Sequence, residues 1–213
     1  MTSLLLSGKK PGKNQDVIAL RSDSKLIYPI SLKAVIMKKI EIFRINHRKK
    51  RDPRLTTHLC LAARAFGASA VYYSGERDLQ LEKSVNDVTK HWGGPFKIKF
   101  IPKERSFVKN YRGTKIHLTM YGEPFNKKLI PLRATRYPLL IIVGGPKVPP
   151  WIYSICDYNL SVTSQPHSEV SALAVFLHEL QSGKELNKQF KGGKLKIVPQ
   201  KSGKKMVRQI PFK

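Results

Sequence analysis

Acidic residues are scarce in this chain of 213 residues, because 14 Asp and Glu stand against 40 Lys and Arg and leave a formal net charge of +26. Lys and Arg that neutralise phosphates release counterions, so a chain with this balance is attracted to nucleic acid. An anionic membrane surface is the second candidate, but the sequence contains no long basic amphipathic helix to support it. The simplest alternative explanation of the net charge is a solvated, lysine-rich surface that binds no partner. Charge therefore favours an RNA or DNA partner.

Cysteine and long apolar runs are also lacking. Cys60 and Cys156 are single and far apart, which excludes a disulfide framework and the paired spacing of a zinc site. His58, His117 and His167 fall on different predicted elements without a carboxylate at ligand spacing, so we expect no metal site. No apolar run approaches the roughly 18 residues of a membrane span. We therefore expect a cytoplasmic protein that does not enter a membrane.

The usual nucleotide and hydrolase motifs are absent. The segment from Gly144 to Lys147 reads Gly-Gly-Pro-Lys and is not a Walker loop, and no GxGxxG follows the first predicted strand. No GxSxG elbow occurs either. The sequence thus gives no indication of a P-loop NTPase, a dinucleotide-dependent enzyme or an α/β-hydrolase.

Strand and helix patterns alternate along most of the chain. Helix signals include Asp52 and Pro53 at a start, and Gly67 at a stop. We expect strands at 39–45, 68–74, 97–101, 115–120, 139–143, 159–163 and 195–198, and helices at 53–66, 79–92, 105–111, 126–135, 149–156 and 168–180. This alternation predicts an α/β fold with a mostly parallel sheet and helices on both faces.

The two ends of the chain differ from the middle. Residues 1–36 have no sustained period, and we interpret them as a weakly ordered extension or a mis-assigned start, with the folded domain over 37–213. The tail from Lys191 holds eight Lys or Arg and no acidic residue. It forms the most basic segment, and we predict that it contacts the charged partner.

Three segments follow predicted strands: 118–122, 144–148 and 162–169. In a parallel sheet they lie on one rim, where such folds bind ligands. Gly144 and Gly145 allow a ligand close to the backbone, and amides near Pro166 and Ser168 are free to donate hydrogen bonds. A tight turn and an ordinary helix cap explain each segment singly. The coincidence of all three favours a ligand.

Six ordered blocks carry a family resemblance: 46–68, 84–96, 115–124, 143–150, 157–177 and 196–205. They resemble the archaeal tRNA 2′-O-methyltransferases that act on cytidine 56, within the SPOUT superfamily. The resemblance starts near Met37. Block 143–150 departs from the family in having Gly145 and Pro146 where relatives often carry other small or acidic residues. A contact made through the backbone should survive that change.

The resemblance implies a SPOUT-type, Rossmann-like fold with a C-terminal trefoil knot, a homodimer, and S-adenosylmethionine bound in the knot. Knots are otherwise nearly absent from proteins, so the family alone supports this one. The implied activity is methylation of the ribose 2′-oxygen of cytidine 56 in the T-loop of tRNA. By position, the cofactor-binding residues would be Leu118, Gly144, Gly145, Pro146, Lys147, Val148, Val162, Thr163, Ser164, Gln165, Pro166, His167, Ser168 and Glu169.

Related ribose methyltransferases use an arginine near the first helix, which makes Arg54 and Arg51 the catalytic candidates. Arginine stays protonated, so it would orient the substrate phosphate and stabilise the developing alkoxide. Histidine is the side chain most often used as a general base, which makes His58 the third candidate. Phosphate binding alone explains both arginines equally well, and a helix-face hydrogen bond is the simpler explanation of His58. Residues 46–48, Asn-His-Arg, are expected at the same entrance.

The RNA-binding surface is expected at Arg48–Arg51 and Lys201–Arg208. Phosphate contacts there would position the tRNA, while exposure of the T-loop base costs on the order of a few kcal/mol by analogy with base flipping. Two alternatives stay open. The chain could be a SPOUT enzyme that methylates a base, or a basic RNA-binding protein without catalysis.

Overall fold

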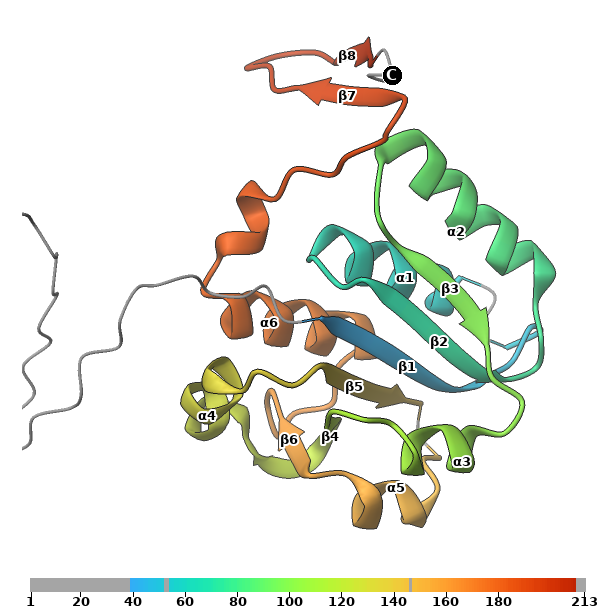
Figure 1. The fold of residues 1–213 in the computed structure, drawn as a ribbon, viewed down its shortest axis with the longest axis vertical. Coiled ribbons are helices and arrows are strands. Elements are labelled where there is room, and N and C mark those ends of the chain that lie inside the picture. The colour runs from blue at the N-terminus through green and yellow to red at the C-terminus, as the bar shows by residue number, and fades with distance from the viewer. Residues whose placement is uncertain (1–38, 52–53, 146, 210–213) are drawn as a thin grey trace, which may run out of the picture. The chain divides into compact units, whose positions relative to one another are not determined.

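The computed structural model describes residues 39–51, 54–145 and 147–209 (Figure 1). Its main sheet has six strands in the order β3-β2-β1-β5-β4-β6, and every neighbouring pair is parallel. The strands are β1 (Ile40–His47), β2 (Ala70–Gly75), β3 (Lys97–Phe100), β4 (Thr114–Pro124), β5 (Leu139–Gly144) and β6 (Tyr158–Ser161). The predicted parallel α/β sheet is confirmed.

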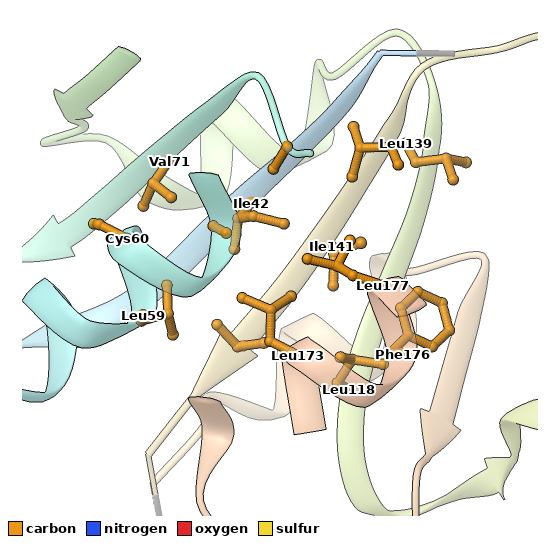
Figure 2. Close-up of a cluster of buried hydrophobic side chains, with 14 of the residues drawn as sticks. Ile42, Leu59, Cys60, Val71, Leu118, Leu139, Ile141, Leu173, Phe176 and Leu177 are labelled. Carbon is orange, nitrogen blue, oxygen red and sulfur yellow. The ribbon is translucent and has the colours of Figure 1, made fainter. Parts of the chain in front are cut away.

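Helices cover both faces of this sheet, as predicted. They are α1 (Leu55–Ala65), α2 (Leu79–Trp92), α3 (Glu104–Lys109), α4 (Leu129–Ala134), α5 (Pro150–Ile155) and α6 (Glu169–Gln181), with 3₁₀ turns η1 (Phe125–Lys128) and η2 (Lys184–Asn187). One hydrophobic cluster joins the sheet to α1, α2, α4 and α6. Figure 2 shows part of it, with Leu59 of α1 and Leu173 of α6 near Ile42 and Ile141. A second cluster joins the opposite face to Val108 of α3 and Ile152 of α5.

Strand β5 shows how the two clusters share one strand. Leu139, Ile141 and Val143 belong to the first cluster, whereas Leu140 and Ile142 belong to the second. Successive side chains point to opposite faces, and helices cover both faces, so a fully apolar strand fits at this position. Full burial of each such side chain is worth roughly 1.5–3 kcal/mol.

Local signals located several helix ends. The range of α2 agrees with the prediction, because Asp78 accepts hydrogen bonds from Gln80 N and Leu81 N and Gly93 ends the helix. Gly67, with φ of +86°, follows the end of α1 as expected. The predicted helix start at Asp52 and Pro53 lies outside the described residues, and α1 as described begins at Leu55.

The strand predicted over 115–120 is confirmed and is longer than expected, so the interpretation of 118–122 as a loop at its end is wrong. Strand β4 continues to Pro124, and a bulge absorbs these residues because Leu118 and Glu123 both pair with Leu160 of β6. Gly122 permits the close approach, since a Cβ there would lie 2.6 Å from the carbonyl carbon of Asn159. The segment is therefore part of β4, and the residues on either side of the bulge pair with the same residue of β6.

The basic tail contains more structure than predicted. The predicted strand at 195–198 is β7 (Leu195–Val198), and it pairs antiparallel with an unpredicted β8 (Lys205–Arg208) in a separate two-stranded sheet. The segment before it packs on α1, where Arg64 donates two hydrogen bonds to the Gly93 carbonyl and lies over the Phe190 ring. Residues 1–36, interpreted as an extension, lie outside the described residues.

Membrane spans and metal clusters are both missing from the part of the chain that the structure describes. None of its helices is long and apolar enough to cross a membrane. The same residues contain no group of three His, Cys, Asp or Glu side chains placed to hold a metal ion. Cys60 is fully buried, and burial raises the pKa of its thiol to about 12, so it serves as a small apolar residue as predicted.

Candidate functional site

The site lies where β1 and β5 end side by side. Their parallel register pairs Ile45 with Gly144, so the residues that follow both strands meet at the same rim. Asn46 Nδ2 donates a hydrogen bond of 3.2 Å to the carbonyl of Lys147. This contact joins the predicted substrate entrance after β1 to the predicted cofactor segment after β5.

A cavity of about 110 Å³ opens at this junction. Its lining residues are Asn46, Arg48, Arg51, Gly145 and Lys147. Three of the five carry a positive charge and none carries a negative one, so the cavity suits an anionic group. Its volume suits a compact anion such as a phosphate rather than a whole nucleoside.

The end of β1 is bent to build this cavity. The pairing of β1 with β2 shifts register between Arg44 and His47, and Asn46 adopts φ of +56°. Asparagine tolerates this left-handed conformation better than most residues. The Asn46 N–H donates to Ser74 Oγ at 3.3 Å, which holds the bend in place. The Asn46 side chain is thereby directed toward Lys147 rather than into the core.

His47 does not line the entrance, contrary to the prediction. It is 1% exposed, because the bulge turns its side chain inward, where Nδ1 lies 2.9 Å from Thr56 Oγ1 and Nε2 lies 3.4 Å from Asp78 Oδ2. Burial acts to raise the pKa of Asp78, but hydrogen bonds from the Leu81 amide, His47 and the Gln80 amide lower it overall. His47 thus connects the starts of α1 and α2.

Arg44 was missed by the sequence analysis. It is 1% exposed, and its Nη1 donates a 2.6 Å hydrogen bond to the Ile45 carbonyl. Its Nη2 lies 3.5 Å from Oε1 of Glu169, the first residue of α6. The available signal was a charged residue inside a strand whose two faces are both covered. This ion pair connects the end of β1 to the predicted cofactor segment after β6.

The three catalytic candidates are not equivalent. Arg51 lines the cavity together with Gly145 and Lys147. Arg54 is the exposed N-cap of α1, and its carbonyl accepts the amide of His58, which is exposed one turn later. Neither Arg54 nor His58 is among the residues that line the cavity. The structure therefore joins Arg51 directly to the predicted cofactor residues, while the other two lie on the adjacent helix.

The predicted cofactor residues divide into three groups. Leu118 is a core residue, and Val148 and Val162 pack against the core. Thr163 Oγ1 accepts the Gln165 amide, and Ser168 caps α6 by accepting the Val170 amide at 3.2 Å, so the predicted helix cap is confirmed. The exposed members are Lys147, Thr163, Ser164, Gln165, Pro166, His167 and Ser168, while Pro146 lies outside the described residues.

The two glycines have different roles. A Cβ on Gly144 would lie 2.6 Å from Val148 Cγ2, so packing of the chain on itself requires that glycine. A Cβ on Gly145 would meet only Glu169 Oε1 at 3.5 Å and Arg44 Nη2 at 3.8 Å, which are ordinary contacts. The backbone at Gly145 is therefore open to a ligand, next to an anchored carboxylate. The Glu169 carboxylate thus lies on one side of the Gly145 backbone, and the cations of the cavity lie on the other.

Comparison with known proteins identifies the family. A family model described as "tRNA ribose 2′-O-methyltransferase, aTrm56" matches residues 92–207. The chain belongs to this family. One aTrm56 relative, the tRNA (cytidine(56)-2′-O)-methyltransferase of Pyrococcus horikoshii, is 48% identical over 171 residues, which cover 79% of this chain and 84% of the relative. The resemblance stated from the sequence is confirmed.

Solved structures agree on the fold of this aTrm56 chain. The TrmH/SpoU tRNA modifying enzyme of A. aeolicus gives a TM-score of 0.51 at 15% identity, covering 71% of this chain and 78% of the other. An AdoMet-bound rRNA methyltransferase from Sinorhizobium meliloti gives a TM-score of 0.50 at 12% identity, and the match covers 68% of this chain and 57% of the other. At such low identity the likeness concerns the fold alone. It confirms the predicted SPOUT-type fold.

Proposed function

We propose that this protein methylates the ribose 2′-oxygen of cytidine 56 in the T-loop of tRNA. The observation that carries the proposal is the cavity in which Arg51 meets Gly145 and Lys147, in a chain 48% identical to a tRNA (cytidine(56)-2′-O)-methyltransferase. The proposed anion site therefore lies next to the segment 144–148, which is expected to hold the methyl donor. We assign the activity to the domain over 37–213, acting on tRNA in the cytoplasm.

S-adenosylmethionine is the proposed methyl donor. When bound, it supplies a methyl group that is already activated on a sulfonium, so the protein's task is alignment and exclusion of water. The segments at 144–148 and 162–169 would hold it, with the open backbone of Gly145 as the close contact. Support comes from the family and from the AdoMet-bound enzyme of the same fold. A trefoil knot formed by the C-terminal part of the domain belongs to the same proposal.

The cations of the cavity would bind the RNA. Arg48, Arg51 and Lys147 line it without a carboxylate among them, so they favour a phosphate next to the target ribose. Arg51 stays protonated and would stabilise the charge that develops on the 2′-oxygen. Arg54 would contact the adjacent backbone. His58, on the exposed side of α1, is the candidate general base.

The remaining tRNA contacts are assigned to the hairpin of β7 and β8. The exposed basic residues of this hairpin lie along one two-stranded ribbon; they are Lys196, Lys204, Lys205 and Arg208.

We also propose a homodimer. Ile130 of α4 is 76% exposed and Val175 of the contacting α6 is 44% exposed, which supplies apolar surface for a second copy.

The test uses unmodified tRNA and S-adenosylmethionine labelled on its methyl group. After incubation, nuclease digestion and mass spectrometry locate the label. A 2′-O-methylcytidine at position 56 is the expected product. A methylated base would favour the base-modifying alternative, and no cofactor binding in calorimetry would favour an RNA-binding protein without catalysis. An unmodified transcript with ribose 2′-deoxy at position 56 is the matched control.

A further inference from the structure

Glu169 is the only acidic residue in the rim segments 46–51, 118–122, 144–148 and 162–169. It is the first residue of α6, directly after the Ser168 cap, where the helix dipole favours a negative charge. Its side chain is 20% exposed, so the carboxylate is neither in the core nor free in solvent. A Cβ on Gly145 would lie 3.5 Å from Oε1, which places the carboxylate against the proposed cofactor wall.

Arg44 fixes this carboxylate from the protein interior. Its guanidinium is held by the Ile45 carbonyl at 2.6 Å and lies 3.5 Å from Glu169 Oε1. Arg44 is 1% exposed, so it is placed to hold Glu169 and not to bind a substrate. Without this anchor, the carboxylate would be drawn toward the cavity cations Arg48 and Lys147, where it would compete with a phosphate.

The positive charge around the site gives weight to the Glu169 carboxylate, although Glu76 Oε2 also accepts the Lys49 amide in the neighbouring basic loop at 2.9 Å. Arg48, Arg51 and Lys147 raise the positive potential at the rim, and that potential repels any cationic ligand. A methyl donor with a sulfonium is cationic at the sulfur, whereas the product left after transfer is a neutral thioether. The two molecules share every other group. The site must bind the methyl donor and release the thioether product. A carboxylate beside Gly145 would attract the donor's sulfonium but not the neutral sulfur of the product.

We propose that the Glu169 carboxylate, held by Arg44, is the counter-charge through which this site binds the sulfonium of S-adenosylmethionine in preference to S-adenosylhomocysteine. The inference rests on the proposed use of that cofactor. Glu169 is a binding residue and Arg44 is a positioning residue. Loss of the sulfonium charge on methyl transfer removes the attraction, so the same pair promotes release of the product.

The test is calorimetric and needs no turnover. Wild-type protein and Glu169→Gln are titrated with S-adenosylmethionine, with S-adenosylhomocysteine, and with sinefungin, which carries an ammonium group in place of the methylsulfonium. We expect the variant to lose about tenfold or more in affinity for both cationic ligands, equivalent to about 1.4 kcal/mol, and less than twofold for the thioether. Equal losses for all three, or no loss, overturn the proposal.

Three further proteins complete the experiment. Glu123→Gln removes an exposed carboxylate on β4, paired with Lys128, and should leave all three affinities unchanged. Arg44→Met should lower the preference for the cationic ligands, and an unchanged preference contradicts its positioning role. Glu169→Asp keeps the charge but retracts it, and should show an intermediate preference if Glu169→Gln does not fold. Absence of S-adenosylmethionine binding by the wild type would instead refute the proposed function.

Discussion

His47 Nδ1 lies 2.9 Å from Thr56 Oγ1. The arginine loop, which carries Arg48, Arg51 and Arg54, connects these two residues along the chain. The imidazole ends β1 and the hydroxyl belongs to the second residue of α1, and both are fully buried. The contact therefore closes the base of the loop whose Arg51 lines the cavity. A buried polar pair of this kind fixes the loop ends, because separation would leave both groups unsatisfied.

Thr56→Val tests this closure. Valine keeps the shape of threonine but removes the hydroxyl, so the buried His47 Nδ1 loses its partner at a cost of about 1–3 kcal/mol. We expect that loss in urea unfolding, together with weaker tRNA binding and unchanged binding of S-adenosylmethionine. Thr57→Val, the same change at the next residue of the helix, is the control. Equal effects of both substitutions would show that the His47 contact has no special role.

Arg51 and Arg54 differ in position, and their substitutions should differ accordingly. Arg51→Ala should lower kcat/KM for tRNA by about 10²–10³, because its guanidinium lines the cavity and would face developing charge. Arg54→Ala, at the exposed N-cap, should have a smaller effect, and both should lower turnover more than cofactor affinity. Arg51→Lys keeps the charge without the planar fork and should be intermediate.

Steady-state kinetics with saturating S-adenosylmethionine measure these effects. Arg105→Ala, an exposed arginine on α3, is the control for general loss of positive charge. If Arg54→Ala proves the more damaging change, the catalytic assignment passes from the cavity to the start of α1. If Arg51→Ala weakens cofactor binding as much as turnover, Arg51 belongs to the cofactor site instead.

Local patterns predicted the parts of the fold that depend on neighbouring residues. The fully apolar run of β5 and the helical pattern of α2 each involve only nearby residues, so both elements were located correctly. The bulge of β4 depends on Leu160, which pairs with both Leu118 and Glu123. No local pattern contains that information, and the segment was predicted as a loop.

The candidate site shows the same division. Arg51 lies with Gly145 and Lys147 at one rim, as expected for residues that follow parallel strands ending at a common edge. His47 was expected beside Arg48 at the entrance, but a register shift in β1 turns it into the interior. Arg44 needed knowledge of its partner Glu169, the first residue of α6. Strands β5 and β4 separate β1 from β6, so the two residues meet through the packing of α6 beside α1 and not through strand pairing.

Glu41 should make stability depend on pH. Burial acts to raise the pKa of this carboxyl, but hydrogen bonds from Lys39, Tyr72 and Tyr111 outweigh it and hold the pKa below its ordinary value of 4.5. The folded state therefore binds the proton less readily than the unfolded state. The resulting stabilisation is complete above about pH 4.5 and is lost as the pH falls through the lower folded value.

Urea unfolding between pH 7 and pH 3 measures this dependence. Tyr111→Phe removes one of the three hydrogen bonds, so its stability should fall less steeply with acid than that of the wild type. Tyr137→Phe, at a residue 70% exposed, is the control and should follow the wild-type curve. A Tyr111→Phe curve parallel to that of the wild type would contradict the role assigned to Glu41.

Arg64 should hold the basic hairpin to the body of the enzyme. Its guanidinium lies 4.7 Å from the centre of the Phe190 ring, in the segment before β7, and donates to the carbonyl of Gly93, which follows α2, through Nε at 3.1 Å and Nη2 at 2.6 Å. The neighbouring Gly94 amide donates to the Lys191 carbonyl at 2.9 Å, so these hydrogen bonds hold the segment indirectly. Arg64→Met keeps the apolar stem but removes both hydrogen bonds, so we expect a loss of about 1.5–3 kcal/mol on unfolding. We also expect faster tryptic cleavage after Lys191 and Lys194, since the segment before β7 is less firmly held.

The same variant separates the hairpin's part in RNA binding from that of the cavity. A displaced hairpin neutralises fewer phosphates, so the dependence of tRNA affinity on salt should become less steep, by about 0.9 in the logarithmic slope for each phosphate that it no longer binds. Binding of S-adenosylmethionine should not change, because Arg64 lies outside the rim segments. Arg64→Lys is the matched variant, since it keeps the charge while losing the paired hydrogen bonds. An unchanged salt slope in Arg64→Met would show that the hairpin does not bind the tRNA.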